Sequence, residues 1–507
     1  MSFNKTQTLY CFLWIILSFL IVFFFEVTIS PRYNLFYGDS TVFQTIAYAW
    51  SDGNIPYRDF FDHKGPYLYL INLIGLAISD SWGLFLLSGT CLSITTIFLW
   101  LTSNLFIRKK QSLVCVLMFL GCYICLNSGG NMTESWCLPF NAIPLYLFCK
   151  SVIKGSYKWW YNIIYGFCFG IIALIRINNG IIPATILLAL FIKSISNKNI
   201  GKGLAHIGIQ LLGVILAIFP VLAYFIHEKA FEELIFANYT FNFEYILKWA
   251  KIAGDSQISS VPRIFTNLKW LLPLFILLAW SICDLLSKNG HRLISLMFSI
   301  ACVVTIVSNM NGMDYLHYYI AFLPLIFMIS VKVLKSLDKW TIKGHFFTKI
   351  MSGIFAIWAL TIFIPSLFGS GLQIGKDVCK FGIIHSSVSN YEIDPIADMI
   401  EKNIPDHKGG AIYNVGTYEG AAAMLKTKTV PVGKYFFLQS KLCKVSDAVA
   451  RELDTYHRYG KPDFIITNKE NTNHGSRSFI SMLERYQLVD STANSIYLFK
   501  IKTSNHE

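Results

Sequence analysis

Charged side chains are scarce in this sequence. Asp, Glu, Lys and Arg make up 14% of the 507 residues, whereas hydrophobic residues make up 54%. A soluble protein carries about a quarter charged residues, which cover its surface. This chain cannot cover its apolar residues in that way, so we expect lipid to be its solvent.

The charges that are present do not indicate a nucleic-acid-binding protein. The net charge of +13 could by itself suggest an anionic polymer as partner. Most basic residues, however, lie in short segments between apolar stretches, where they are better explained as membrane topology signals. We therefore expect membrane lipid as a partner and no nucleic acid.

The sequence also lacks a disulfide framework. It has 12 cysteines, most of them in or beside apolar stretches, where Cys behaves as a small hydrophobic residue. Cys122 and Cys125 have redox-motif spacing, but they lie inside an apolar stretch, which favours packing. Only Cys379 and Cys443 lie in the polar C-terminal part, and the sequence leaves open whether they pair.

Long apolar stretches predict a mostly α fold, a polytopic membrane helical bundle with about eleven transmembrane helices. Several are shorter than the roughly 20 residues that a spanning helix needs, so their boundaries are loose. The stretches are 9–29, 82–106, 112–126, 136–153, 160–175, 180–194, 204–226, 268–287, 292–309, 316–334 and 349–368.

The connecting segments predict the orientation. The short loops 127–135 and 310–316 contain no Lys or Arg, and basic residues gather in the alternate loops. Those basic loops contain Lys5, Arg108 to Lys110, Lys150, Lys154, Lys158, Lys193, Lys198, Lys202, Lys288, Arg292, Lys332, Lys335, Lys339 and Lys343. Because basic loops stay inside, we predict a multi-pass cell-membrane protein with a cytoplasmic N-terminus and an extracytoplasmic C-terminal part.

Residues 370–507 have a different character. Charges return in near balance, and short apolar runs alternate with polar ones. Ala411–Val415, Phe464–Thr467 and Ser495–Ile501 are predicted strands, and Asp447–His457 is a predicted helix. We predict two domains: 1–369, transmembrane and catalytic, and 370–507, an extracytoplasmic α/β domain. The latter has no Gly-rich phosphate loop or nucleophile elbow, so we place the chemistry elsewhere.

The first external segment, 30–81, is too apolar for an ordinary loop. Ser40–Trp50 has apolar residues at helical spacing, which predicts a helix in the membrane interface, and Tyr67–Ile78 predicts a second. Carboxylates and a lysine lie at the ends of these helices. This arrangement suits a substrate that is itself lodged in the membrane.

The order of these features resembles the C-type (GT-C) membrane glycosyltransferases. The likeness is strongest to the branch with the aminoarabinose transferase of lipid A and the protein O-mannosyltransferases. The motifs that carry it are Tyr37-Gly38-Asp39, Tyr57 to Pro66, Gly129–Glu134 with Pro139, Gly166–Gly180 with Arg176, and His317-Tyr318-Tyr319 with Pro324. Two departures leave room for another sugar or acceptor: Gly65-Pro66 replaces two prolines, and Glu134 stands where aspartate is common.

The resemblance implies a transferase that moves a sugar from a polyprenyl-phosphate donor to an acceptor hydroxyl on the outer face. The acceptor would be a cell-envelope glycan, a lipid or a protein. Asp39 would be the general base, and Glu134 would orient the acceptor or hold a metal. The sequence requires no cofactor, and a divalent metal stays an open alternative. Lys64 would bind the donor phosphate, helped by Arg176 and His63. The implied substrate-binding residues are Asp59, Asp62, Tyr37, Tyr57, Trp136, His317 and Tyr318.

Each candidate also has a simpler explanation. Asp39 precedes an apolar helix and could be its N-cap. Asp59 and Asp62 suit turn or cap positions, and Lys64 could extend to lipid headgroups. Arg176 ends a span on the side where basic residues are disfavoured, which favours a function. His317 is the weakest candidate, because a lone His at a helix start usually has a structural role.

Two other function classes remain open. An O-antigen-type polymerase or ligase would concentrate arginines and a histidine in a large late external loop, but segment 310–316 is short. A transporter or flippase of polyprenyl-linked glycans would have inverted repeats or broken, charged central helices, and the sequence has no such repeat. The transferase therefore remains the favoured function.

Overall fold

The structure, a computed structural model, describes residues 5–33, 35–252, 260–286, 291–310, 315–337, 346–384, 390, 392–404, 411–437 and 445–502. The chain forms two compact units, each built from three separate segments. The helical unit comprises residues 1–32, 84–221 and 258–387, and the sheet unit comprises 33–83, 222–257 and 388–507. The chain therefore leaves the helical unit three times and returns to it twice.

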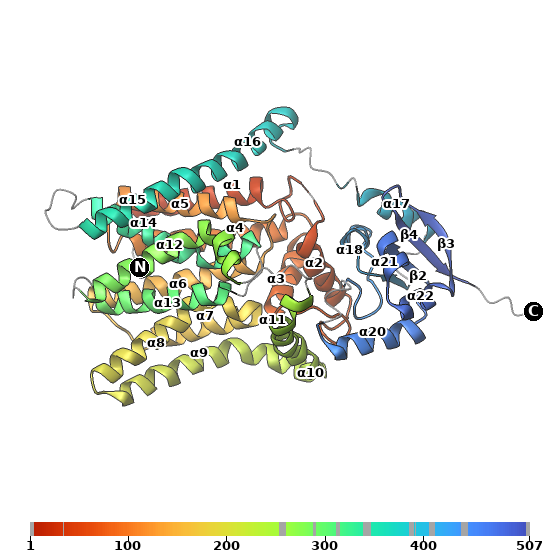
Figure 1. Cartoon of the computed structure of the whole chain (residues 1–507), viewed down its shortest axis with the longest axis horizontal. Coiled ribbons are helices and arrows are strands. Elements are labelled where there is room, and N and C mark those ends of the chain that lie inside the picture. Colours follow the sequence, from red (N-terminus) through yellow and green to blue (C-terminus); the bar gives the residue numbers. More distant parts are fainter. Residues whose placement is uncertain are drawn as a thin grey trace, which may run out of the picture. The chain divides into compact units, whose positions relative to one another are not determined.

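The helical unit contains helices that run side by side (Figure 1). Its elements are α1 (Lys5–Phe25), α4 (Gly83–Ser103), α5 (Lys109–Leu126), α6 (Thr133–Lys154), α7 (Tyr161–Arg176), η1 (Ile177–Asn179), α8 (Ile181–Ser196), α9 (Ile200–His227), α12 (Ser260–Leu286), α13 (Arg292–Met310), η3 (Leu316–Phe322), α14 (Leu323–Leu337), α15 (Phe346–Trp358), η4 (Ala359–Phe363) and α16 (Ile364–Phe381). The last residues of α9 belong to the sheet unit.

Nine helices in the described ranges are long and apolar enough to cross a membrane. They coincide with nine of the eleven predicted stretches. The other two, 180–194 and 292–309, form the shorter apolar helices Ile181–Ser196 and Arg292–Ser308. The chain is a multi-pass membrane protein, and the exact count of eleven stays a prediction.

Small residues allow two of these helices to pack closely. Gly166 and Gly170 of α7 face α9, where a Cβ built on Gly166 would lie 1.8 Å from the Gln210 carbonyl oxygen. A Cβ on Gly213 of α9 would lie 2.1 Å from the Ile163 carbonyl oxygen. The Gly-x-x-x-Gly spacing thus brings the two backbones into contact, which is a common way to join membrane helices.

The last helix continues beyond the predicted domain boundary. Residues 346–381 form one continuous helical stretch, so the predicted division at 369/370 falls within α16. Its end is attached to the segment after α1, because the buried Arg32 guanidinium pairs with Asp377 and donates to the Gly382 and Ile383 carbonyls. Cys379 is an exposed free thiol on α16, and Cys443 lies outside the described residues.

The sheet unit contains a four-stranded sheet with helices on both faces. Its helices are α2 (Gly38–Ser51), α3 (Pro66–Ile78), α10 (Phe231–Ile235), η2 (Phe236–Thr240), α11 (Phe241–Ile252), α17 (Asp394–Asn403), α18 (Tyr418–Lys426), α20 (Asp447–Tyr459), α21 (Lys469–His474) and α22 (Arg477–Leu483). Its strands are β1 (Ile412–Asn414), β2 (Phe464–Asn468), β3 (Tyr486–Ser491) and β4 (Ile496–Ile501), in the order β1-β2-β4-β3. The three predicted strands and the predicted helix 447–457 are confirmed.

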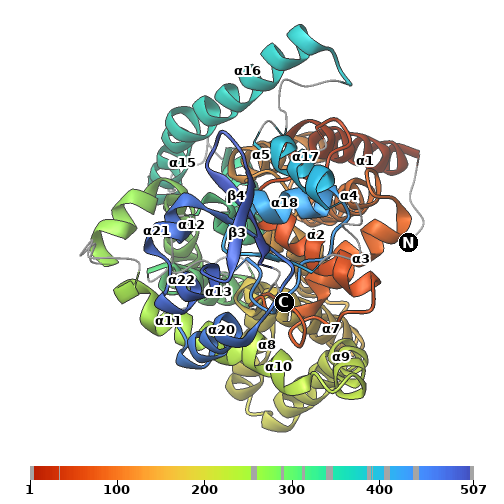
Figure 2. The same cartoon turned by 90° about the vertical axis from the view of Figure 1, so that its right-hand side faces the viewer.

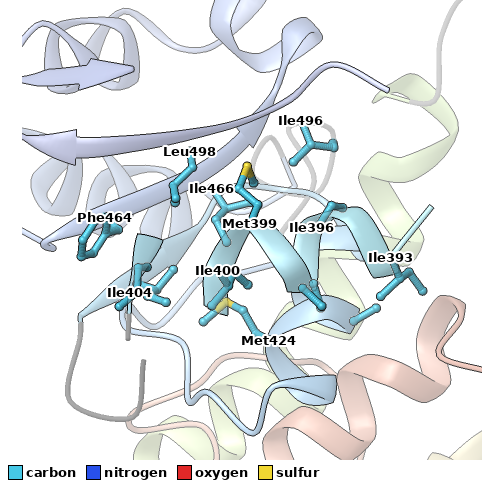
Figure 3. Close-up of a cluster of buried hydrophobic side chains, with 14 residues drawn as sticks. Ile393, Ile396, Met399, Ile400, Ile404, Met424, Phe464, Ile466, Ile496 and Leu498 are labelled. Carbon is cyan, nitrogen blue, oxygen red and sulfur yellow. The ribbon is translucent and has the colours of Figure 1, made fainter. Parts of the chain in front are cut away.

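Alternating residues supply the two apolar faces of the sheet. Phe464 and Ile466 of β2 pack with α17 and α18 on one face (Figure 3). Ile465, between them, packs with Tyr413 and the α22 residue Phe479 on the other. In Figure 2, α17 and α18 lie on one side of β3 and β4, and α21 and α22 lie on the other. The period-two pattern of a strand explains this division.

The sheet unit should lose stability in mild acid. His457 of α20 is buried beside Tyr413 and Phe479, and burial lowers the pKa of its imidazole to about 4. The unfolded chain therefore binds this proton at higher pH than the folded chain does, so the stability present above about pH 6.5 is lost as the pH falls toward 4. We expect a loss of about 2 kcal/mol between pH 7 and pH 5. Hydrogen exchange at β1 and β2 of the full chain measures it, and an equal pH dependence in His457→Gln would contradict this assignment.

Candidate functional site

The segment between the first two spans contains the two predicted helices, α2 and α3. The chain turns into α2 at Gly38, whose φ of +56° lies in the left-handed region that glycine adopts without strain. α2 packs against α3 and against α18, and most of its residues are buried on all faces. α3 keeps Ile74 and Ile78 exposed. The apolar side chains of α2 therefore mainly contact protein, and α3 supplies the exposed apolar surface of the pair.

Asp39 lies in the first turn of α2 and is not its N-cap. The N-cap is Tyr37, and it makes no side-chain capping bond. The half-buried Asp39 carboxylate instead accepts a hydrogen bond from the Tyr418 hydroxyl at 3.2 Å. Tyr418 begins α18, so this bond joins the segment between the first two spans to the C-terminal part of the same unit. The capping explanation of Asp39 is thus wrong in this fold.

Asp59 stabilises the turn that precedes Asp62 and Lys64. Its carboxylate accepts the Ile55 backbone N–H at 2.7 Å. It also accepts two bonds from the Arg58 guanidinium, both at 2.9 Å. Both Asp59 oxygens are therefore engaged within the turn, which matches the structural explanation considered for this residue.

Asp62 is a buried anion beside Lys64. Its side chain accepts the Tyr69 hydroxyl at 2.6 Å and the His63 backbone N–H at 2.7 Å. Burial alone would raise the pKa of this carboxyl, but the nearby Lys64 ammonium and the hydrogen bonds from His63 and Tyr69 outweigh burial and hold the pKa well below its usual range. Asp62 is only 2% exposed, so its position suits the orientation of Lys64 better than direct contact with a substrate.

His63 lies between the Asp62 carboxylate and the aromatic ring of Tyr245. Its Nδ1 is 3.2 Å from Asp62 Oδ1, its ring stacks on Tyr245, and its carbonyl accepts a bond from Asn242. Tyr245 and Asn242 belong to α11, a helix that the sequence reasoning did not single out. The segment 222–257 therefore supports the Asp62–Lys64 motif from a distant part of the sequence.

Lys64 presents a cation at the start of the apolar helix α3. Its Nζ lies 2.8 Å from His63 Nε2, and its carbonyl accepts the hydroxyl of the buried Tyr57 at 2.7 Å. In the part of the chain that the structure describes, no carboxylate oxygen lies within 4.0 Å of this ammonium. The Lys64 charge is therefore held in place without being neutralised by a direct ion pair, as a phosphate-binding group requires.

A second cluster lies in the helical unit. Glu134, in the first turn of α6, is 1% exposed, and its Oε1 accepts the Arg176 guanidinium at 2.6 Å. Its Oε2 accepts the Thr133 hydroxyl at 2.9 Å. The Arg176 guanidinium also lies over the Tyr318 ring, with its central carbon 4.2 Å from the ring centroid. Three residues predicted from separate motifs thus form one cluster, in which Glu134 is buried and Arg176 and Tyr318 are partly exposed.

The remaining candidates lie at the edges of these clusters. Trp136 is 2% exposed and donates its indole N–H to Asn131, so it packs inside the protein. Tyr37 is 67% exposed. The His317 ring contacts Tyr315 and Tyr318. Of these three, only Tyr37 offers a freely accessible aromatic face.

Two residues that lie in or near these clusters were not predicted from the sequence. Tyr418 was missed because nothing local connects it to Asp39, 379 positions away. Glu26 was missed because it lies inside the predicted stretch 9–29, although it is a fully buried carboxyl that directly follows α1. A single carboxylate at the end of an apolar stretch is costly, and that signal could have identified Glu26.

The described ranges contain no group of three or more His, Cys, Asp or Glu residues arranged to hold a metal ion. The two oxygens of Glu134, the residue considered as a metal ligand, accept bonds from Arg176 and Thr133.

Comparison with solved structures shows a GT-C fold. ArnT from Cupriavidus metallidurans bound to undecaprenyl phosphate superposes with a TM-score of 0.61 at 11% identity, over 98% of this chain and 99% of that one. The Archaeoglobus fulgidus oligosaccharyltransferase tethered with an acceptor peptide gives 0.51 at 12% identity, over 97% of this chain and 74% of that one. The same organism's AglB in complex with an inhibitory peptide and a dolichol-phosphate gives 0.52 at 12% identity, over 99% and 75%. The predicted GT-C resemblance is confirmed at the level of the fold.

Comparison of sequences places the chain in a family. No match is found among curated proteins. Residues 4–363 match the family described as "Putative competence-induced protein Ccs4 N-terminal domain", which covers well over half of the chain. The chain therefore belongs to this family, and its fold is that of the GT-C membrane proteins.

Proposed function

We propose that this protein transfers a sugar from a polyprenyl-phosphate donor to an acceptor hydroxyl at the outer face of the membrane. The observation that carries the proposal is the position of Lys64. This ammonium lies at the start of an apolar helix, is supported by His63, and has no carboxylate in direct contact among the described residues. Such a position suits a lipid-linked phosphate, because the ammonium can bind its anionic group and the apolar helix can contact its apolar tail.

The comparisons support a donor of this class. Among the similar structures, ArnT contains undecaprenyl phosphate and AglB contains a dolichol-phosphate. Because these similarities establish the fold alone, the donor of this chain rests on its own residues. The sugar and the acceptor, whether glycan, lipid or protein, are open within the proposal.

Asp39 would act as the general base. Its carboxylate takes the proton of the acceptor hydroxyl while that oxygen forms a bond to the anomeric carbon. The bond from this carbon to the phosphate oxygen breaks, and the polyprenyl phosphate leaves with the bonding electrons. Lys64 stabilises the charge that develops on the leaving phosphate, and Asp62 keeps the lysine in position. The Tyr418 hydroxyl orients the Asp39 carboxylate.

Glu134 and Arg176 would form a second functional group of residues, within the helical unit. Since Glu134 already compensates the Arg176 charge, this pair adds directed hydrogen-bond donors without a large net charge. The Arg176 side chain is 22% exposed, whereas that of Glu134 is 1% exposed, so Arg176 is the member of the pair that a substrate could reach. We assign to the pair a role in orienting substrate groups.

Sidedness is directly testable by cysteine labelling. In a variant with all 12 cysteines replaced by serine, one cysteine is introduced at a time at the exposed positions Lys110, Ser128 and Ala450, which test three separate segments. The distribution of basic residues predicts that a membrane-impermeant thiol reagent labels positions 128 and 450 on intact cells, and position 110 only after lysis. A protected cysteine at position 450 would contradict both the span count and the orientation.

The proposed reaction is tested with purified protein in lipid nanodiscs. Polyprenyl-phosphate sugars, with the matching nucleotide sugars as controls, are supplied with envelope glycans, lipids and proteins as acceptors. We expect new glycosylated product, detected by mass spectrometry, with the lipid-linked donors only. Transfer from the nucleotide sugar alone would refute the donor class, and absence of transfer from every polyprenyl donor would refute the function.

A further inference from the structure

A fully buried carboxyl group lies at the end of the first span. Glu26 directly follows α1, and its side chain is 0% exposed. Its Oε2 accepts the Ser88 hydroxyl of α4 at 2.7 Å, and its Oε1 accepts the Tyr123 hydroxyl of α5. One side chain therefore joins three helices of the helical unit, and a buried carboxyl is too costly to be retained without such partners.

The network continues from Tyr123 to the Glu134–Arg176 pair. The Tyr123 hydroxyl also lies 3.2 Å from the Ser135 Oγ, and Ser135 follows Glu134 in α6. Glu134 in turn accepts the Arg176 guanidinium. Hydrogen bonds and a single peptide bond thus connect Glu26 with the buried ion pair.

The segment after α1 also determines the shape of the loop that precedes Glu134. Gly130 has a φ of +97°, and a Cβ at this position would lie 2.7 Å from the Glu26 Cβ. Thr28 donates its backbone N–H to the Gly129 carbonyl at 2.9 Å and its hydroxyl to the same oxygen at 3.0 Å. Residues 26–28 therefore contact the Gly129–Gly130 turn, which precedes Glu134, and they also contact Tyr123.

A side chain with two acceptor oxygens is well suited to this position. Each Glu26 oxygen accepts one neighbouring hydroxyl, that of Ser88 at Oε2 and that of Tyr123 at Oε1. The Tyr123 hydroxyl is thereby held at Glu26, and the same hydroxyl lies 3.2 Å from the Ser135 Oγ. A glutamine of the same shape would present an amide donor to one of these hydroxyls and would remove that constraint.

We infer that Glu26 is a positioning residue for the Glu134–Arg176 pair, acting through Tyr123, Ser135 and the Gly129–Gly130 turn. The inference deepens the proposed function and rests on it for the role of the pair. Glu26 itself touches no substrate in this scheme.

The experiment combines hydrogen exchange with kinetics on the full chain in nanodiscs. Glu26→Gln and Tyr123→Phe are compared with the wild type and with Glu401→Gln, an exposed carboxylate on α17. Both test variants should exchange faster at residues 127–136 and at wild-type rates at residues 464–468. For transfer, kcat should fall about tenfold in each with smaller changes in KM, and the double variant should fall no further, because the two residues act in one network.

The outcomes separate this inference from a purely structural role and from the proposed function. Unchanged exchange at 127–136 in both variants would overturn it, as would faster exchange without a loss of kcat. Additive losses of kcat that follow the melting temperature would indicate general destabilisation and also overturn it. If the wild type transfers no sugar, the proposed function fails, and the exchange data still decide whether Glu26 controls the loop.

Discussion

Asp39→Asn should lower the transfer rate by about 10²–10⁴-fold while expression and melting temperature stay close to those of the wild type. The amide keeps the shape of the side chain and can still accept the Tyr418 hydroxyl, but it cannot take the acceptor's proton. The measurement is kcat for transfer from a polyprenyl-phosphate sugar. Because Asp39 makes no capping bond in this fold, a large structural effect is not expected.

Asp52→Asn is the matched control for this experiment. Asp52 is exposed at the C-terminal end of the same helix, α2, and it should tolerate the same isosteric change without loss of activity. Near-wild-type transfer by Asp39→Asn would remove Asp39 as the base. Asp59 and Asp62 would be the next candidates in sequence, although both are engaged by protein donors.

Lys64→Ala should weaken donor binding and transfer together, with a loss of about 10²–10³ in kcat/KM. The ammonium attracts the phosphate in the bound donor and more strongly as the leaving group gains charge, so both the ground and transition states are affected. Binding of a polyprenyl phosphate, measured by native mass spectrometry, reports the first effect, and product formation reports the second. Lys64→Arg should rescue only in part, since a planar guanidinium does not replace a compact ammonium.

Lys428→Ala is the control for Lys64. Lys428 is an exposed lysine of the same unit, paired with Asp80, and its removal should change neither binding nor transfer. Since Lys64→Ala also removes the positive charge that most favours the buried Asp62 carboxylate, the melting temperature of each variant is needed. Unaffected binding and transfer in a folded Lys64→Ala protein would refute the phosphate assignment.

The sequence was most informative where a local pattern carries the information. The spacing of Val42, Phe43 and Ile46 predicted α2, and Pro66 correctly indicated the start of α3. The short apolar runs predicted β1, β2 and β4. Helices and strands leave a signature in the residues that form them, because each buries one face or a continuous run of side chains.

The sequence also suggested most site residues, but not their partners. It indicated Glu134, Arg176 and Tyr318 as three separate candidates, and the fold joins them into one cluster. It gave Asp62 a substrate-binding role. In the fold Asp62 is buried, accepts a hydrogen bond from the Tyr69 hydroxyl and lies close to the Lys64 ammonium. Residue type and sidedness favour a chemistry, but distance and burial decide which atom remains accessible.

Composition, hydropathy and the placement of basic residues thus determined by themselves that the chain is a multi-span membrane protein with a C-terminal α/β part. Only the tertiary structure decided that Tyr418 contacts Asp39, that α11 supports His63, and that Tyr123 links Glu26 to Ser135. These contacts join residues 12 to 379 positions apart. Hydrophobic periodicity is a local property of a sequence, whereas such pairs form only when whole helices pack and their buried polar groups must find partners.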